Sequence, residues 1–233
     1  MVLAVPAFGQ QNYVSRFDLY GGYAFLESPH VKLFENGFAT QIGVRPKPWL
    51  SLGFDYTIAA GKLTIVPDLL LPALQTQLNT SIQQAILAGA FPPPNSYNYA
   101  NLNVPGHSRT QTFAVGPELV YRHFSKATIF LRPVYAGVIH ETATPQPQDP
   151  VVNALVFGVP GVPGLIAGPS KTDNVGFVGF GGGFDILFGK HFAWRTQADL
   201  VWDHLFSDLL QDGRFTMRFS CGPAFNFGPN IKK

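Results

Sequence analysis

The sequence predicts an all-β fold: an eight-stranded antiparallel up-and-down β-barrel that crosses a membrane with its strands. Three observations predict it. Eight segments of about ten residues alternate between apolar and polar side chains, which is the period of a β-strand. The charged residues of these segments all fall on the polar face of their strand. The connections between the segments alternate between short and long, as in a barrel with loops at one end.

The composition agrees with a membrane protein built from strands. Only 13% of the 233 residues are charged, whereas about 25% is usual, and 24 glycines and 20 prolines disfavour a helical bundle. No apolar run reaches the length of about 18 residues that a transmembrane helix needs. The net charge of +2, without a basic run, argues against a nucleic-acid partner. Cys221 is the single cysteine, so no internal disulfide is expected, and no cofactor or metal site is expected either.

The predicted strands cover residues 16–26, 37–45, 50–58, 112–122, 128–139, 177–188, 193–203 and 214–228. The last one shows the pattern most clearly, because Phe215, Met217 and Phe219 alternate with Thr216 and Arg218. In 128–139 the same period places four side chains opposite Arg132, namely Ile129, Leu131, Tyr135 and Ile139. Each segment therefore has one apolar face and one polar face.

Five acids and five arginines on the polar faces are candidates for ion pairs: Asp18, Asp55, Glu118, Asp185, Asp199, Arg45, Arg122, Arg132, Arg195 and Arg218. A soluble barrel would place the aromatic face inside, but eight strands enclose room for modest side chains only. More than a dozen aromatic rings do not fit there. We therefore expect the rings to face lipid and the charges to form ion pairs inside the barrel.

Two short connections predict particular ion pairs. A hairpin centred on Ser125 places Glu118 directly across from Arg132, and a hairpin centred on Lys190 places Asp185 across from Arg195. Directly opposite side chains lie about 5 Å apart, so both pairs are within reach of an ion pair.

Three prolines lie inside predicted strands: Pro117, Pro133 and Pro223. Each lacks the N–H that a strand paired on both sides would donate, so bulges or irregular pairing are expected at these positions. The hairpin centred on Ser125 also places Pro117 opposite Pro133.

The chain divides into three predicted parts. Residues 1–14 form a tail that resembles the end of a signal peptide, because Val2 to Phe8 is apolar and Ala7-Phe8-Gly9 fits a cleavage site. Residues 15–228 form the barrel, with long extracellular loops at 59–111 and 140–176, and residues 229–233 form a C-terminal tail. Both termini are then expected in the periplasm. Residues 69–90 have a helical repeat of leucine and isoleucine, which predicts a helix that caps the barrel or packs on a neighbouring loop.

Aromatic residues are expected at both membrane interfaces. Trp194 and Trp202 lie on the lipid face of one strand, roughly 20 Å apart along the membrane normal. With Trp49 and Tyr121 they form the predicted aromatic girdles.

At this point the sequence resembles the small eight-stranded outer-membrane barrels, the OmpA-type transmembrane domain and its relatives, over residues 15–60 and 110–228. The most specific likeness is the family's C-terminal assembly signal, carried here by Ser220, Gly222, Phe225 and Phe227. The residues from Gly228 to Lys233 depart from the family, in which the signal commonly ends the chain. The resemblance implies insertion by the barrel-assembly machinery and partners among outer-membrane lipids and lipopolysaccharide.

The sequence predicts a monomeric outer-membrane barrel with a plugged polar interior, which stabilises the envelope or displays its loops. One alternative is a narrow pore for ions or small solutes, and a soluble ligand-carrying barrel is another. A third is a lipid-modifying enzyme, because polar residues that suit a His/Ser/acid site lie at the outer ends of strands: His107, Ser108, His140, Glu141, Asp203, His204, Ser207 and Asp208. These residues form no motif, so no catalytic residue is assigned.

Overall fold

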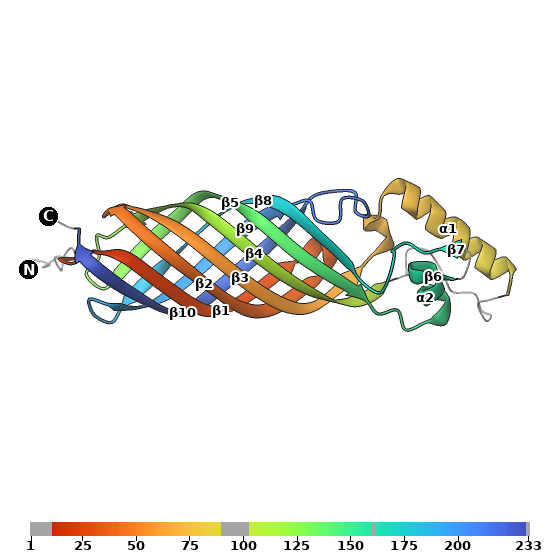
Figure 1. Cartoon of the computed structure of the whole chain (residues 1–233), viewed down its shortest axis with the longest axis horizontal. Coiled ribbons are helices and arrows are strands. Elements are labelled where there is room, and N and C mark those ends of the chain that lie inside the picture. Colours follow the sequence, from red (N-terminus) through yellow and green to blue (C-terminus); the bar gives the residue numbers. More distant parts are fainter. Residues whose placement is uncertain (1–10, 90–102, 160–161, 232–233) are drawn as a thin grey trace, which may run out of the picture.

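The computed structural model describes residues 11–89, 103–159 and 162–231. Eight long strands close into an antiparallel barrel in the order β1-β10-β9-β8-β5-β4-β3-β2 (Figure 1). They are β1 (Ser15–Ser28), β2 (Leu33–Lys47), β3 (Leu50–Ile65), β4 (Val104–Tyr121), β5 (Ala127–Pro145), β8 (Lys171–Leu187), β9 (Phe192–Asp203) and β10 (Arg214–Asn230). The predicted fold class is therefore confirmed.

The two ends of the barrel differ. The first and last described residues, Gln11 and Ile231, and the short connections β2–β3, β4–β5 and β8–β9 lie at one end, which we call the turn end (Figure 1). The opposite loop end carries the remaining connections. They contain the helices η1 (Pro29–Val31), η2 (Pro67–Leu69), α1 (Pro72–Leu87) and α2 (Pro150–Phe157), and the small hairpin of β6 (Gly158–Val159) and β7 (Val162–Pro163).

Helix α1 lies where the sequence predicted a helix, whereas α2 was not predicted. Pro72 begins α1, and Leu78 and Ile82 on its apolar face are buried. Helix α2 begins at Pro150 after Asp149, whose carboxylate accepts a hydrogen bond of 2.8 Å from the Val151 N–H. An aspartate followed by proline is typical of a helix start, so this signal was present in the sequence.

The strands run further toward the loop end than the sequence pattern indicated. Strand β3 continues to Ile65 and β4 begins at Val104, while β5 continues to Pro145 and β8 begins at Lys171. The loops predicted at 59–111 and 140–176 are shorter for this reason. Strand β10 also passes residue 228 and ends at Asn230. Residues 1–10 of the predicted N-terminal tail and 232–233 of the C-terminal tail lie outside the described residues.

The strand extensions escaped prediction because their pattern is reversed. On β3 the apolar Leu63 is buried inside the barrel and Lys62 is exposed on its outer face. A search for strands with an apolar outer face therefore ends near residue 58, although the hydrogen-bonded ladder continues.

Strand β5 contains a bulge beside two of the three prolines. The pairing of β4 with β5 shifts between Val115 and Leu119, and that of β5 with β8 shifts between Arg132 and Tyr135. The irregularity expected at Pro117 and Pro133 is thus confirmed. At Pro223 the pairing with β9 is regular, whereas the ladder with β1 is interrupted between Ala224 and Cys221 without a change of register, so the expected irregularity is present on the β1 side only.

The bulge reverses the alternation of β5. Tyr135 and Ile139, which the sequence pattern placed on the lipid face with Ile129 and Leu131, are each 1% exposed and lie inside the barrel. One extra residue in a bulged strand moves every later side chain to the opposite face. The outward residues after the bulge are Val134, Ala136 and Val138.

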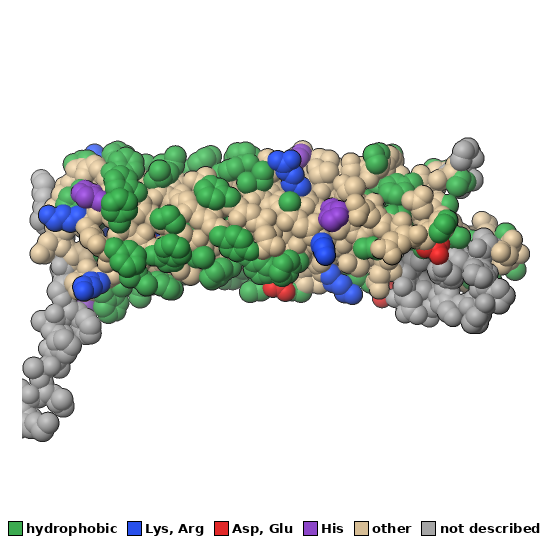
Figure 2. Space-filling model, turned by 90° about the horizontal axis from the view of Figure 1, so that it is seen from below, with side chains coloured by type: hydrophobic (Ala, Val, Ile, Leu, Met, Phe, Trp, Pro, Cys, Tyr) green, Lys and Arg blue, Asp and Glu red, His purple; other side chains and the backbone are tan. Residues whose placement is uncertain are grey.

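The outer wall carries an apolar belt (Figure 2). Its exposed members include Leu19, Tyr23, Phe38, Ile42, Leu52, Phe54, Phe113, Val115, Leu119, Ile129, Leu131, Val138, Val178, Phe180, Phe184, Ile186, Trp194, Trp202, Phe219, Phe225 and Phe227. Charged outward residues lie at its borders, with Arg16 and Lys47 at the turn end and Glu27, Lys62 and Arg109 toward the loop end. The aromatic rings of the belt therefore point away from the lumen, which is the reverse of a soluble barrel.

Candidate functional site: a charged lumen below an apolar chamber

The lumen holds nearly all of the charges for which the sequence predicted ion pairs. Nine of the ten side chains belong to buried residues: Asp18, Arg45, Asp55, Glu118, Arg132, Asp185, Arg195, Asp199 and Arg218. Strand alternation directs them inward, and the belt residues between them point outward. The tenth, Arg122, follows β4 at the turn end and is half-buried.

A central cluster of Asp55, Asp199, Arg132 and Arg218 crosses the lumen. Arg218 on β10 donates to Asp55 on β3 at 2.9 Å and to Asp199 on β9 at 2.7 Å. Arg132 on β5 donates to Asp55 and lies 3.4 Å from Asp199. The Tyr135 ring lies 4.1 Å from the Arg132 guanidinium carbon. Charge-assisted hydrogen bonds thus join four strands around the barrel axis.

In both ion pairs predicted from hairpin geometry, the two partners lie close to each other. Asp185 and Arg195 are direct cross-strand neighbours and share two hydrogen bonds of 2.8 and 3.0 Å. The Oε1 atom of Glu118 lies 3.8 Å from the Nε atom of Arg132. The same oxygen accepts a hydrogen bond of 2.5 Å from the Gln41 side chain. The bulge begins just beyond Glu118, which explains why this second pair is looser.

Toward the turn end, Asp18 links two arginines. It lies 3.0 Å from Arg45 and 3.1 Å from Arg195. Arg122 differs from its prediction, because among the described residues it has no carboxylate within ion-pair distance. Its guanidinium donates to the Pro48 carbonyl at 3.0 Å and to the Gln11 side chain at 3.2 Å. Burial, followed by repulsion from Arg45, lowers the pKa of Arg122 to about 9, so the group is still charged at neutral pH.

A further charged group near the loop end was missed by the sequence analysis. Arg214 binds Asp203 at 3.0 Å and also contacts Glu141, and all three side chains are buried. Glu35 is fully buried as well, beside the hydroxyl groups of Ser108 and Thr110 on β4. Glu35 is an even number of residues away from Gln41 and Arg45 and therefore lies on the same inward face. Extending the predicted strand toward the N-terminus would have identified it.

The polar residues at the strand ends do not form a His/Ser/acid site. Ser108 and Glu141 point into the lumen, whereas their neighbours His107 and His140 lie on the outer wall. His107 contacts the Gly61 carbonyl and His140 contacts Asn174. At the remaining rim positions, Asp203 binds Arg214, Asp208 binds Lys171, His204 packs edge-on against Trp202, and Ser207 is exposed. Within the described ranges, no group of three or more His, Cys, Asp or Glu residues is arranged to hold a metal ion.

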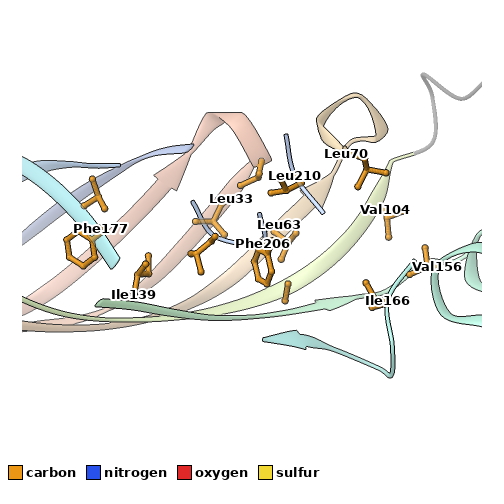
Figure 3. Close-up of a cluster of buried hydrophobic side chains, with 14 of the residues drawn as sticks. Leu33, Leu63, Leu70, Val104, Ile139, Val156, Ile166, Phe177, Phe206 and Leu210 are labelled. Atoms are coloured by element: carbon orange, nitrogen blue, oxygen red, sulfur yellow. The ribbon is translucent and has the colours of Figure 1, made fainter. Parts of the chain in front are cut away.

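Above the charges, the loop end of the lumen is apolar (Figure 3). Side chains from the strands, including Leu33, Leu63, Val104 and Phe177, pack with Phe206 and Leu210 from the β9–β10 loop. Leu78 of α1 and Val156 of α2 complete the cluster. We call this region the loop-end chamber. It contains a cavity of about 70 Å³ with Glu141 and Arg214 in its lining.

The predicted girdle and assembly-signal residues lie on the expected faces of their strands. Trp49, Tyr121 and Trp194 are exposed near the turn end, and Trp202 is exposed near the loop end of β9. Phe225 and Phe227 point outward, whereas Ser220 and Gly222 face the lumen. A side chain at Gly222 would collide with the Gly21 carbonyl at 2.4 Å, so glycine is required where β1 closes on β10.

These features define a class of protein: a closed eight-stranded barrel with an apolar outer belt and a charged, buried lumen. None of the helices in the described part of the chain has the length and apolar character to span a bilayer.

Comparisons with solved structures agree on the fold. The chain is similar to Neisserial surface protein A, with a TM-score of 0.51 and 10% identity over 91% of this chain and 98% of that chain. It is also similar to Ail of Yersinia pestis (TM-score 0.46, 11% identity, 92% and 99% covered). A third is OprG of Pseudomonas aeruginosa (TM-score 0.45, 8% identity, 94% and 99% covered). No family model and no curated protein matches the chain. The likeness to Neisserial surface protein A shows the fold of the small outer-membrane barrels, as the sequence resemblance implied.

Proposed function

We propose that the chain is a monomeric integral protein of the bacterial outer membrane, with a closed lumen, that stabilises the envelope and displays its loops. The termini lie in the periplasm and the loop end faces the outside. The apolar belt supports this proposal, because a surface with so many exposed aromatic rings and aliphatic chains is favourable in contact with lipid and unfavourable in contact with water. Trp49, Tyr121 and Trp194 then form the periplasmic girdle, and Trp202 belongs to the outer one.

The assembly of the barrel follows from the same proposal. Ser220, Gly222, Phe225 and Phe227 serve as the signal that the barrel-assembly machinery recognises. Phe225 and Phe227 are exposed on the outer face of β10, where another protein can reach them. Outer-membrane lipids and lipopolysaccharide are the permanent partners of the belt.

The central cluster is the observation that carries the closed-lumen proposal. Its two arginines and two aspartates are all buried and bind one another across the axis. A hydrated ion passing this level would have to separate charges that are already paired in a low-dielectric interior. The geometry therefore favours a plug over a pore.

Conductance in planar bilayers tests this proposal. Wild-type protein is expected to give no steady single-channel current, because the central cluster blocks the axis. A fourfold variant with serine at positions 55, 132, 199 and 218 lacks the crossing side chains and is expected to conduct. Steady currents through the wild type would contradict the closed lumen.

The loop-end chamber favours a second candidate function, the binding of a small apolar group. The walls of its cavity are almost entirely aliphatic or aromatic. Its volume of about 70 Å³ is below the roughly 150 Å³ of cavities that hold benzene, so the terminal carbons of an alkyl chain fit best. An apolar cavity of this kind binds a ligand because water is a poor occupant.

A short alkane such as hexane is expected to raise the temperature at which the folded band disappears on unboiled gels. Leu63→Trp fills the chamber and should abolish this rise, whereas Leu52→Trp on the outer face of the same strand should keep it. Hexane also partitions into the detergent, but this contributes equally to the temperatures measured for the two variants. An equal response of both variants would exclude the chamber as the binding site.

A further inference from the structure

The outer wall changes character where β3, β4 and β5 rise beyond the apolar belt. On β4 the outward residues change from Phe113 to Gln111, Arg109 and His107 in the direction of the loop end. On β3 they change from Ile58 to Ala60 and Lys62. The same side of the wall thus offers apolar groups below and cations directly above.

Lys62, His107 and Arg109 form one patch, which we call the basic patch. Lys62 and His107 are direct cross-strand partners, and Ala60 pairs with Arg109 one step closer to the belt. Partners on one face lie about 5 Å apart and diagonal neighbours about 7–8 Å, so all three side chains can reach one ligand. Figure 2 shows basic and histidine side chains at this edge of the belt.

Lys62 and Arg109 are not neutralised by any acid in the part of the chain that the structure describes. All three residues are exposed, and within the described ranges neither Lys62 nor Arg109 forms an ion pair. No carboxylate faces outward on β3, β4 or β5 above the belt. The acid at the same level is Glu27 on β1, and Phe34 of β2 lies between it and Lys62.

We propose that the basic patch binds the phosphate groups of a phosphorylated glycolipid of the lipid A class in the outer leaflet. This inference rests on the proposed function, in which the loop end faces outward. Such a lipid places its phosphates directly above its acyl chains, and the patch lies directly above Ile58 and Phe113. Arginine offers paired donors to phosphate oxygens and lysine adds a compact charge.

The experiment uses the full chain, folded in a nonionic detergent without lipopolysaccharide. Its affinity is measured for bis-phosphorylated lipid A and for the same lipid with both phosphates removed. We expect the wild type to bind the phosphorylated lipid at least tenfold more tightly. The double variant Lys62→Gln/Arg109→Gln should lose this preference, and Lys62→Arg should retain it. The control Arg16→Gln/Lys47→Gln removes two exposed cations at the turn end and should retain it as well.

Three results would overturn the inference: equal wild-type affinity for both lipids, a preference that survives in the double variant, or its loss in the turn-end control. Heparin is measured in parallel, and a double variant that loses heparin binding but keeps the lipid preference assigns the patch to sulfated glycans instead. The proposed function is tested separately: it fails if the protein is absent from outer-membrane fractions. The binding assay in detergent does not depend on where the protein is located in the cell.

Discussion

Replacing Arg218 with methionine is expected to destabilise the barrel by about 3–5 kcal/mol, because it leaves buried carboxylates without their main partner. Arg218 is the only group that contacts both Asp55 and Asp199 at less than 3 Å within the described residues. Without it, two buried negative charges share Arg132 alone. The free energy of unfolding in urea, followed by the folded band on unboiled gels, measures the loss.

A second substitution identifies the cause of this loss. Adding Asp199→Asn to Arg218→Met removes one excess negative charge and should restore part of the stability, which a double-mutant cycle quantifies. Arg16→Met removes an exposed cation at the turn end and should change the stability little. A loss below about 1 kcal/mol for Arg218→Met would show that the central cluster is not the main electrostatic support of the fold.

Phe54→Arg is expected to cost about 2–4 kcal/mol in a lipid bilayer, because a guanidinium would replace a ring in the middle of the apolar belt. Ala60→Arg places the same charge on the same outer face of β3, above the belt and beside Lys62, and should have little effect. The comparison is made by urea unfolding of protein folded into vesicles. Equal costs for the two variants would contradict the position of the membrane along β3.

Much of the barrel could be predicted because lipid imposes a simple pattern. The alternation in β10, from Phe215 to Phe227, is visible in the sequence and agrees with the exposed and buried residues of that strand. Hairpin geometry also brought Asp185 to Arg195, because a short turn fixes the register of the two strands that it joins.

Contacts across the lumen could not be predicted in this way. Arg218 meets Asp55 although β10 and β3 are not paired, and this contact depends on the stagger of all strands around the closed barrel. The charges near the loop end were missed for another reason: Glu35 and Glu141 lie just outside the predicted segments 37–45 and 128–139, and Arg214 is the first residue of its segment. Phe34 and Phe215 beside these charges still point outward, so the lipid pattern reaches this part of the barrel on β2 and β10.

The bulge of β5 has a consequence for how the gene can vary. Pro133 and Val134 both point outward between the inward Arg132 and Tyr135, so the extra residue of β5 is absorbed at this one place. Deleting one residue at the bulge would restore a regular strand and keep Glu141 inside and Val138 outside, whereas deleting one residue between Tyr135 and Glu141 would turn Glu141 toward the outside. A single-residue deletion is therefore tolerated at the bulge but not in the regular part of the strand beyond it, whereas the loops beyond residue 145 are free of this constraint.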